Sequence, residues 1–335
     1  MSETILQVKN LKKYYMVGRK GLFGEKEYVK SVDGVSFTLH RGETLAIVGE
    51  SGCGKSTTVK SLIRVTEPTS GEVILKGQDF LKLKGEELKK ARRNIKMIFQ
   101  DPYSSLNPRM TVRDIIGEPV DIEHCYKTEE EREKLILDTM ELVGLNRDFA
   151  DRYPHEFSGG QRQRIGIARA IVLNPSLVVC DEPVSALDVS IQSQVLNLLR
   201  QLQESMGMAY IFISHNLSVI KHISDRVMVM YLGHVVELAD KKELFANPSH
   251  PYTQALLSAI PVPERHSKRK KIILQGDLPS PANPPSGCIF HTRCFMAQEI
   301  CSTQKPELRD IGGGHLCACH FCNGACAQNG TTEEK

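Results

Sequence analysis

The sequence predicts an α/β protein built on a mostly parallel sheet, with an inserted helical subdomain and a small cysteine-rich segment near its C-terminus. Three observations lead to this fold class. Short apolar runs alternate with amphipathic helical patterns through the first part of the chain. A glycine-rich turn, residues 49–57, directly follows one of these runs. Seven of the ten cysteines lie between Cys288 and Cys326.

The composition is that of a soluble globular protein. Its 335 residues are enough for one large domain and a smaller appendage, and the net charge of +3 is too small to indicate a nucleic-acid-binding protein. No run of about 18 apolar residues, the length that spans a bilayer, is present, and the N-terminus lacks the pattern of a secretory signal. We therefore expect the protein in the cytosol, where thiols are kept reduced.

The apolar runs predict strands, and most of these strands are expected to be buried on both faces because they contain few polar residues. A helix is expected from about Lys55 to Val65, since Pro68 follows it closely. The stretch from 103 to 174 predicts mainly helix, with Thr128 and Glu131 as a capping box, and another helix is expected at 190–206. The expected strands are 3–9, 27–39, 44–48, 73–75, 95–99, 177–180, 210–213 and 227–230.

Residues 49–57 match the pattern G-x4-G-K-[ST] of a phosphate-binding loop, after an expected strand and before an expected helix. In such a loop the backbone N–H groups surround the β-phosphate, and the helix N-terminus adds the positive end of its dipole. Lys55 is expected to contact the β- and γ-phosphate oxygens, and the Ser56 hydroxyl to ligate Mg²⁺. The ATP-binding residues expected here are Gly49, Ser51, Gly52, Gly54, Lys55, Ser56 and Thr57.

A second motif ends the apolar run 177–180 with two acids, Asp181 and Glu182. At the end of a strand, Asp181 can hold the coordination shell of Mg²⁺, and Glu182 can orient or deprotonate an attacking water. Together the two motifs predict a nucleotide hydrolase.

A third motif narrows the class of hydrolase. Phe157-Ser158-Gly159-Gly160-Gln161 resembles the signature of ATP-binding cassette (ABC) ATPases, which is usually written LSGGQ, with Phe157 in place of the leucine. The resemblance implies a P-loop ABC ATPase core with an antiparallel β subdomain and an inserted helical subdomain. It also implies a dimer, in which the signature residues Ser158, Gly159, Gly160 and Gln161 bind the γ-phosphate of an ATP held by the opposite subunit.

Other elements of the ABC family follow in the family's order. Gln100 resembles the Q-loop glutamine that touches Mg²⁺ and senses the membrane partner, and His215 resembles the switch histidine that contacts the γ-phosphate. Asp188 ends a stretch, Ser185–Asp188, that resembles the D-loop and contributes to the ATP site. Tyr15 is expected to stack on adenine, with Tyr14 as the alternative. The resemblance thus implies Glu182, His215 and Lys55 as catalytic residues, and Ser56, Gln100 and Asp181 as the Mg²⁺ site.

Three stretches resemble the ATPases of oligopeptide and dipeptide importers, namely Phe99–Pro108, Asn247–Thr253 and the cysteine segment. Pro154–Gln161 and Cys180–Ser185 are similar to the second of the two ATPases that such importers use. This implies a peripheral protein on the cytoplasmic face of the membrane that couples ATP hydrolysis to peptide uptake. The implied partners are a homologous ATPase subunit in a heterodimer, two transmembrane permease subunits and, indirectly, an extracytoplasmic solute-binding protein.

Two alternatives for the function remain open. Nickel, glutathione or another small solute is a possible cargo, because an ATPase subunit does not touch the transported molecule. A soluble ABC ATPase of DNA repair or translation is the other alternative. Gln100 and Ser158 are only 58 positions apart (158 minus 100), which leaves no room for the long coiled coil of the repair proteins. We therefore expect no nucleic-acid partner.

The predicted domain boundaries follow from these motifs and from the composition. Residues 1–246 form the nucleotide-binding domain, with its helical subdomain at about 103–174. Prolines become frequent after Asn247, which predicts a proline-rich and basic linker over 247–286. Its basic run, 265–271, is expected on a solvated surface, with attraction to anionic lipid as the alternative. The cysteine-rich segment takes 287–335.

The cysteine segment is interpreted as a metal site. Cys288, Cys294 and Cys301 have five and six residues between them, and Cys319 follows after seventeen more. In the peptide-importer ATPases such a set resembles the ligands of a 4Fe–4S cluster. Four thiolates also fit zinc, and free thiols are a third possibility. The context Ala318-Cys319-His320 favours Cys319 as the fourth ligand, with Cys317, Cys322 and Cys326 as alternatives or as spare thiols.

Overall fold

The computed structural model describes residues 3–19, 26–260 and 271–322, so that Cys326 and all but the last residue of the basic run 265–271 lie outside the described residues. The chain divides into two compact units. Unit 1 comprises the described part of Met1–Leu6 with Thr38–Thr44 and Ile74–Ser214, and unit 2 comprises Gln7–Phe37, Leu45–Val73 and the described part of His215–Lys335.

Three parallel strands form the buried centre of unit 1: β6 (Ile95–Ile98), β7 (Leu177–Asp181) and β8 (Ala209–Ile213). β7 lies between the other two, with Leu177 opposite both Ile95 and Ala209. Every residue of β7 and β8 is buried, which explains why both are continuous apolar runs. The strands predicted here are confirmed to within one residue at each end.

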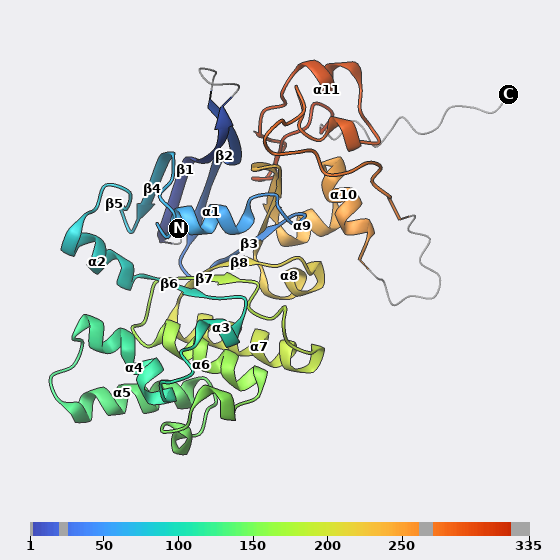
Figure 1. Ribbon diagram of the computed structural model, residues 1–335. Coiled ribbons are helices and arrows are strands. Elements are labelled where there is room, and N and C mark those ends of the chain that lie inside the picture. Colours follow the sequence, from blue (N-terminus) through green and yellow to red (C-terminus); the bar gives the residue numbers. More distant parts are fainter. Residues whose placement is uncertain (1–2, 20–25, 261–270, 323–335) are drawn as a thin grey trace. The chain divides into compact units, whose positions relative to one another are not determined.

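The helical part of unit 1 packs around α6 (Gly159–Ile171), which contacts α3 (Pro102–Ser105), α4 (Val112–Glu123) and α5 (Glu129–Leu142) (Figure 1). The prediction of helix between 103 and 174 is therefore confirmed. The other elements of this unit are β5 (Gln78–Asp79), α2 (Gly85–Arg93), η1 (Arg147–Phe149), η2 (Pro154–Glu156) and α7 (Val189–Met206).

The capping box predicted at the start of α5 forms only in part. The Thr128 hydroxyl accepts a hydrogen bond from the Glu131 N–H at 3.3 Å. The Glu131 carboxylate, however, accepts from the N–H of Lys127 at 2.8 Å instead of that of Thr128. The cap still satisfies one of the orphan N–H groups of the helix.

Long strands dominate the N-terminal part of the chain. β1 (Thr4–Arg19) and β2 (Lys26–His40) are side by side, and β4 (Ser70–Leu75) flanks β1 on its other edge. The predicted strands 3–9 and 27–39 located these elements, but the end of β1 was missed. Its second half carries several exposed side chains, so the alternation that marks a half-buried strand is lost there.

Unit 2 also contains β3 (Thr44–Val48) and β9 (Arg226–Tyr231), which are parallel neighbours in a sheet. β10 (His234–Asp240) runs antiparallel to β9. The cysteine segment extends this sheet with β12 (Leu316–Cys317), which pairs with β10, and β11 (Arg309–Asp310). The segment is thereby joined to the body of unit 2 by main-chain hydrogen bonds.

The helices of unit 2 are short, and one of them falls where the sequence predicted a linker. α10 (Pro251–Ser258) has its Tyr252 side chain fully buried, so this part of 247–286 is packed structure. The other helices are α1 (Lys55–Leu62), α8 (Leu217–Ile223), α9 (Lys241–Ala246), η3 (His291–Arg293) and α11 (Glu299–Thr303). Over the described ranges of both units, none of the helices has the length and apolar character needed to cross a membrane.

Candidate functional site

The phosphate loop connects β3 to α1, as the sequence predicts, and close packing explains two of its glycines. A Cβ on Gly49 would lie 2.2 Å from the Met230 carbonyl oxygen, and one on Gly54 would lie 2.2 Å from the Ser31 carbonyl oxygen. Both residues have positive φ angles, 149° and 103°, which residues other than glycine rarely adopt. The loop therefore depends on glycine at both positions.

Lys55 is the first residue of α1 and is buried. Its Nζ atom donates hydrogen bonds to the carbonyl oxygens of Gly49 at 2.8 Å and Glu50 at 3.0 Å. These two bonds keep the ammonium group inside the curl of the loop, where phosphate oxygens are expected. Of the other predicted loop residues, Ser51 and Gly52 are exposed, and Gly54, Ser56 and Thr57 are half-buried.

Asp181 and Glu182 lie at the end of β7 in unit 1. Asp181 is buried, and Glu182 is half-buried with a positive φ of 49° and an N–H that donates to the Ile213 carbonyl at 3.0 Å. The Gln100 side-chain amide donates to Glu182 Oε2 at 2.9 Å. The structure thus brings together the predicted Q-loop glutamine and the predicted water-activating carboxylate.

The predicted signature forms the start of α6. Ser158 is the N-cap: its hydroxyl accepts from the Gln161 N–H at 3.4 Å, and the Gln161 side chain accepts from the Ser158 N–H at 3.0 Å. Ser158 is exposed, whereas a Cβ on Gly160 would come within 2.5 Å of Ile191. Phe157 is buried edge-on against Phe149, with ring centroids 5.7 Å apart. This packing accounts for a large apolar side chain at the first position of the signature.

Asp188 caps the next helix, α7. Its carboxylate accepts from the Ile191 N–H at 3.0 Å and from the Ser190 hydroxyl at 2.8 Å, and these bonds hold the pKa of Asp188 below its usual range. Asp188 is exposed. A Cβ added to Gly159 would lie 3.5 Å from a Leu187 methyl group, so the predicted D-loop and the predicted signature are neighbours within unit 1.

The two tyrosines proposed for adenine differ clearly in environment. The Tyr14 hydroxyl donates to Asp33 at 2.7 Å, and burial together with this bond raises the pKa of Tyr14 to about 12. Tyr15 is 40% exposed, and the Lys13 ammonium lies 4.9 Å from its ring centroid. Tyr14 is thus engaged in an internal contact, and Tyr15 is the more exposed of the two tyrosines.

His215 follows β8 and is exposed. It belongs to unit 2 with Tyr15, Lys55 and Ser56, whereas Gln100, Ser158, Asp181, Glu182 and Asp188 belong to unit 1. The structure describes the geometry of each set within its own unit.

The comparison with known proteins supplies the family. The oligopeptide transport ATP-binding protein AppF of Bacillus subtilis is 58% identical over 323 residues, which is 95% of this chain and 98% of that protein. The chain belongs to the ABC transporter family. A family model described as ABC transporter matches residues 32–185, and one described as oligopeptide/dipeptide transporter, C-terminal region, matches residues 236–301.

Two further comparisons agree with this assignment to the ABC family. The dipeptide transport ATP-binding protein DppF of Haemophilus influenzae is 53% identical over 94% of this chain and 96% of its own length. Among solved structures, a dimeric post-hydrolysis state of the ATP-binding cassette MJ0796 bound to ADP and Pi superposes with a TM-score of 0.62 and 30% identity. That match covers 71% of this chain and 99% of the other. The predicted family and the predicted ABC ATPase fold are confirmed.

The cysteine segment of this ABC protein contains a small cavity. Four cysteines line it together with aromatic residues such as Phe290 and His291; these are Cys288, Cys294, Cys301 and Cys319, the four that the spacing singled out. Burial raises the pKa values of Cys288 and Cys294. Among the described residues, however, no group of three or more His, Cys, Asp or Glu side chains is arranged to hold a metal ion. The predicted metal-binding character of the segment is thus not supported by the structure.

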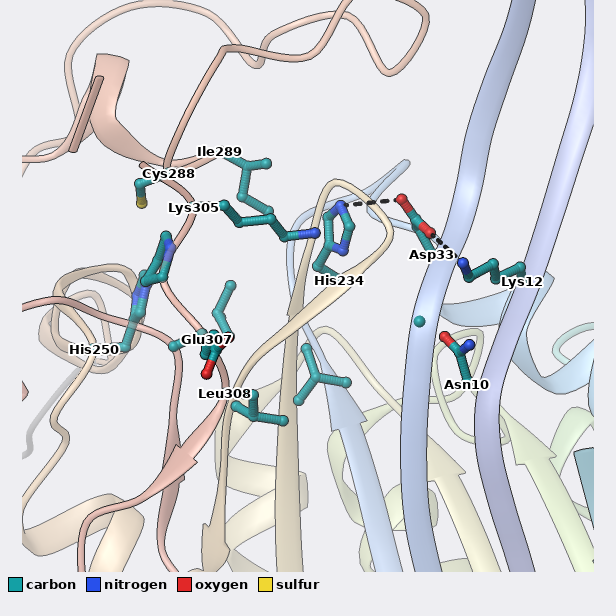
Figure 2. A pocket seen from close by; sticks show the side chains of 15 residues that line it. Asn10, Lys12, Asp33, His234, His250, Cys288, Ile289, Lys305, Glu307 and Leu308 are labelled. Carbon is teal, nitrogen blue, oxygen red and sulfur yellow. Dashed lines mark ion pairs between the residues drawn. The ribbon is translucent and has the colours of Figure 1, made fainter. Parts of the chain in front are cut away.

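A larger cavity of about 490 Å³ lies beside the cysteine segment in unit 2 (Figure 2). Asp33 faces Lys12 at 3.9 Å and His234 at 3.8 Å across it, and Lys305 also contributes to its lining. Burial, more than the repulsion from Lys305, lowers the pKa of His234 to about 4. The His234 ring is therefore neutral near neutral pH.

Two contacts to the phosphate loop come from residues for which the sequence predicted no role at the ATP site. The Tyr252 hydroxyl accepts a hydrogen bond from the Glu50 N–H at 2.8 Å. The Arg293 guanidinium, from the cysteine segment, donates to both Glu50 carboxylate oxygens, at 2.7 and 3.2 Å. Neither was visible in the sequence because each lies more than 200 positions from Glu50.

Proposed function

We propose that this chain is the ATP-hydrolysing subunit of an importer for oligopeptides or dipeptides. The observation that carries the proposal is the 2.9 Å hydrogen bond from Gln100 to Glu182 at the end of β7. It links the residue expected to sense a membrane partner to the residue expected to activate water. Relatives named as oligopeptide and dipeptide transport ATP-binding proteins support the class of cargo.

In this proposal one set of residues binds the phosphates and Mg²⁺, and another positions the attacking water. Lys55 leaves its loop carbonyls to contact the β- and γ-phosphates, and the N–H groups between Gly49 and Thr57 surround them. Ser56, Asp181 and Gln100 would hold Mg²⁺, which would neutralise charge on the phosphates when bound. Hydroxyl, carboxylate and amide oxygens are ligands that Mg²⁺ prefers, so the residue types fit the ion.

Glu182 orients the attacking water, and His215 contacts the γ-phosphate. Gln100 donates to the Glu182 carboxylate and so fixes its direction. Because the transferred phosphoryl group needs little covalent help, positioning and charge account for most of the expected catalysis. Tyr15 supplies the exposed ring for adenine.

We further propose that the site is completed by a homologous ATPase in a heterodimer. The exposed N-cap Ser158 supports this, since it stands at a helix N-terminus that presents N–H groups to an anion. Asp188, which is also expected at the ATP site, is exposed at the start of α7. The dimeric form of the similar cassette MJ0796 supports it as well. In the heterodimer, Ser158, Gly159, Gly160 and Gln161 bind the γ-phosphate held by the partner.

The proposed membrane contact is a groove in unit 1. A cavity of about 420 Å³ there is lined by Phe99, next to Gln100, and by Glu118 and Arg169 from the helical part. A cytoplasmic loop of each of two permease subunits would dock there, which places the chain at the cytoplasmic face of the membrane. The solute-binding protein outside the membrane would select the cargo. The domain boundaries 1–246, 247–286 and 287–335 remain a proposal, with the helix α10 inside the second region.

For the cysteine segment we propose a 4Fe–4S cluster held by Cys288, Cys294, Cys301 and Cys319. Their shared cavity supports the choice of these four over Cys317 and Cys322. The cluster would cross-link a segment too short to fold on its own apolar residues. Iron and acid-labile sulfide assays on anoxically purified protein test this, and a protein that contains only zinc would contradict it.

The proposed hydrolysis is tested with the Glu182→Gln variant in the purified transporter. We expect loss of ATP turnover and a trapped, ATP-bound heterodimer that is stable to gel filtration. The matched control is Glu204→Gln, whose exposed carboxylate pairs with Arg200 at 3.2 Å on the surface of α7, away from the strand end and the groove. Rapid residual hydrolysis by Glu182→Gln would argue against its role.

A further inference from the structure

The cysteine segment holds the phosphate loop through one ion pair. Arg293 is the last residue of η3, one position before Cys294, and its two terminal nitrogens bind the two carboxylate oxygens of Glu50. Such bidentate pairing is stronger and more directional than a single contact. The side chain of Arg293 is only 10% exposed and that of Glu50 is 28% exposed. The pair is therefore shielded from solvent far more than an ordinary surface ion pair.

Arg293 follows a residue that is anchored by aromatic packing, and its N–H donates to the Phe290 carbonyl oxygen at 3.0 Å. Phe290, three residues earlier, packs edge-on against Tyr231 at 5.2 Å and tilted against Tyr252 at 5.3 Å. The hydrogen bonds to Glu50, more than any other cause, raise the pKa of Arg293 above its ordinary value. The guanidinium is thus charged and fixed in direction before any ligand binds.

The backbone of Glu50 is also held by hydrogen bonds. Its N–H donates to the Tyr252 hydroxyl at 2.8 Å, and its carbonyl oxygen accepts from Lys55 Nζ at 3.0 Å. One residue therefore receives contacts from the cysteine segment, from α10 and from the lysine of the loop. A shift of the Glu50 backbone would move the first N–H groups of the phosphate cradle.

The charge of Glu50 also needs compensation. Its carboxylate belongs to the residue directly after Gly49, in a loop that is expected to receive the negative phosphates of ATP. An unpaired carboxylate so close to the phosphates would repel them, and the partly buried setting weakens the screening by water. Lys55 does not offset this charge through a side-chain contact, since it binds the carbonyl oxygens of Gly49 and Glu50.

We propose that Arg293 is a positioning residue for ATP binding: it neutralises and fixes Glu50 so that the loop accepts the phosphates. The cysteine segment is then a functional part of the nucleotide site and more than an appendage. This inference rests on the proposed function, because it presumes that the loop binds ATP.

The test measures the dissociation constant for Mg·ATP with the full-length chain, by isothermal titration calorimetry. Arg293→Gln is expected to weaken binding about tenfold, the equivalent of one charge-assisted hydrogen bond. In the double variant Glu50→Gln/Arg293→Gln both charges are gone, and affinity is expected to return to within about threefold of the wild type. Arg293→Lys keeps the charge without the bidentate geometry, and an intermediate affinity is expected.

Arg309→Gln is the matched control, because Arg309 belongs to the same segment but donates to the carbonyl oxygens of Cys319 and His320. It is expected to bind ATP like the wild type. Unchanged affinity in Arg293→Gln would overturn the inference. So would a double variant as defective as Arg293→Gln, since the arginine would then act only by supporting the fold. If Arg293→Gln does not fold, Arg293→Lys with wild-type affinity is the overturning result.

A failure of the proposed function can be distinguished from a failure of the inference about Arg293. A wild-type chain that does not bind Mg·ATP, or a Lys55→Ala variant that binds it normally, would refute the ATP site itself, and with it the inference about Arg293 that rests on that site. A wild-type chain that binds ATP, with no effect at Arg293, refutes only the role of the cysteine segment.

Discussion

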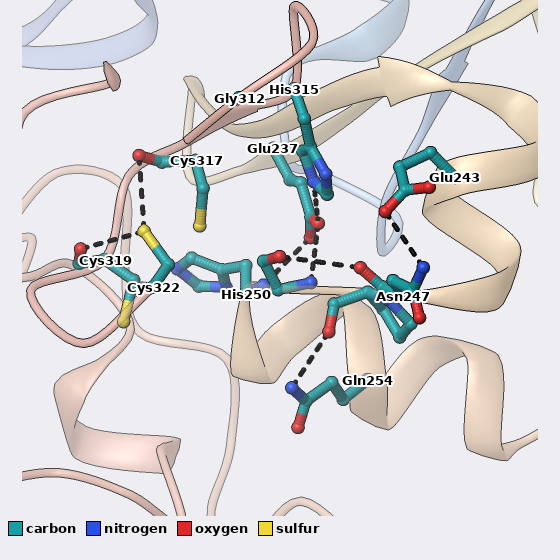
Figure 3. Close-up of polar contacts among 12 residues, drawn as sticks. Glu237, Glu243, Asn247, His250, Gln254, Gly312, His315, Cys317, Cys319 and Cys322 are labelled. Atoms are coloured by element: carbon teal, nitrogen blue, oxygen red, sulfur yellow. Dashed lines mark hydrogen bonds and ion pairs between the residues drawn. The ribbon is translucent and has the colours of Figure 1, made fainter. Parts of the chain in front are cut away.

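Glu237 joins the cysteine segment to β10, and we expect its replacement by glutamine to loosen that junction. Its side chain is fully buried, and three donors converge on it (Figure 3). One carboxylate oxygen accepts from the Ser249 N–H at 2.7 Å and lies 2.7 Å from His315 Nε2. The other oxygen accepts from the His250 N–H at 3.0 Å.

The magnitude follows from these contacts. A glutamine keeps one acceptor oxygen but turns an NH₂ group toward a donor, so at least one of the three donors loses its partner. Hydrogen bonds to a charged group contribute about 1.5–3 kcal/mol each, and removing one partner of a buried ion pair costs about 3–5 kcal/mol. We therefore expect Glu237→Gln to destabilise the protein by about 4 kcal/mol, which lowers the Tm by about 10 °C.

The assay is thermal unfolding of the full-length chain, with limited proteolysis to locate the loosened part. Cleavage is expected to begin in the cysteine segment of Glu237→Gln. The control is Glu243→Gln, whose exposed carboxylate accepts only a surface hydrogen bond from Asn247, at 3.0 Å, among its described contacts. It should cost less than about 0.5 kcal/mol. Equal Tm values for the two variants would refute the reasoning.

Three further predictions concern the same unit. The Glu237 hydrogen bond, more than any other cause, raises the pKa of His315. The stabilisation from this pair is therefore full below the ordinary histidine pKa of 6.5 and is lost as the pH rises through the higher pKa of the folded state. The Tm difference between the wild type and His315→Gln should shrink over that pH interval. Gly54→Ala should unfold the loop region, whereas Gly77→Ala, with a φ of 81° and no neighbouring atom within 4 Å, should cost only about 1–2 kcal/mol in denaturant titrations. Tyr15→Ala should weaken binding of ATP in fluorescence titrations by about tenfold while inorganic triphosphate binds unchanged, and equal losses for both ligands would contradict adenine stacking.

Much of the nucleotide site could be predicted from the sequence because its residues lie in short, continuous motifs. The strand before Gly49, the turn and the helix from Lys55 are all local features, and β7 is marked by a fully apolar run. The same holds for Ser158, because the residues Ser158–Gln161 by themselves predict that it caps α6. Local patterns therefore predicted the strands, the helix start and the helix cap that position the candidate residues in each unit.

The contacts between distant segments could not be predicted in this way. Nothing local to Arg293 indicates that it meets Glu50, because 243 positions separate them. The prolines after Asn247 resemble a linker, yet Pro251 opens α10 and Tyr252 supplies its buried ring. Proline is tolerated in the first turn of a helix, so composition alone cannot separate the two cases.

The most direct test of the account is a structure of the whole transporter with Mg·ATP and the Glu182→Gln variant. The account predicts that Ser158 Oγ lies within hydrogen-bond distance of the γ-phosphate bound by the partner ATPase. It also predicts that Lys55 of this chain has left the carbonyls of Gly49 and Glu50 for its own ATP. A closed, ATP-bound dimer in which Ser158 faces solvent, far from any γ-phosphate, would contradict it.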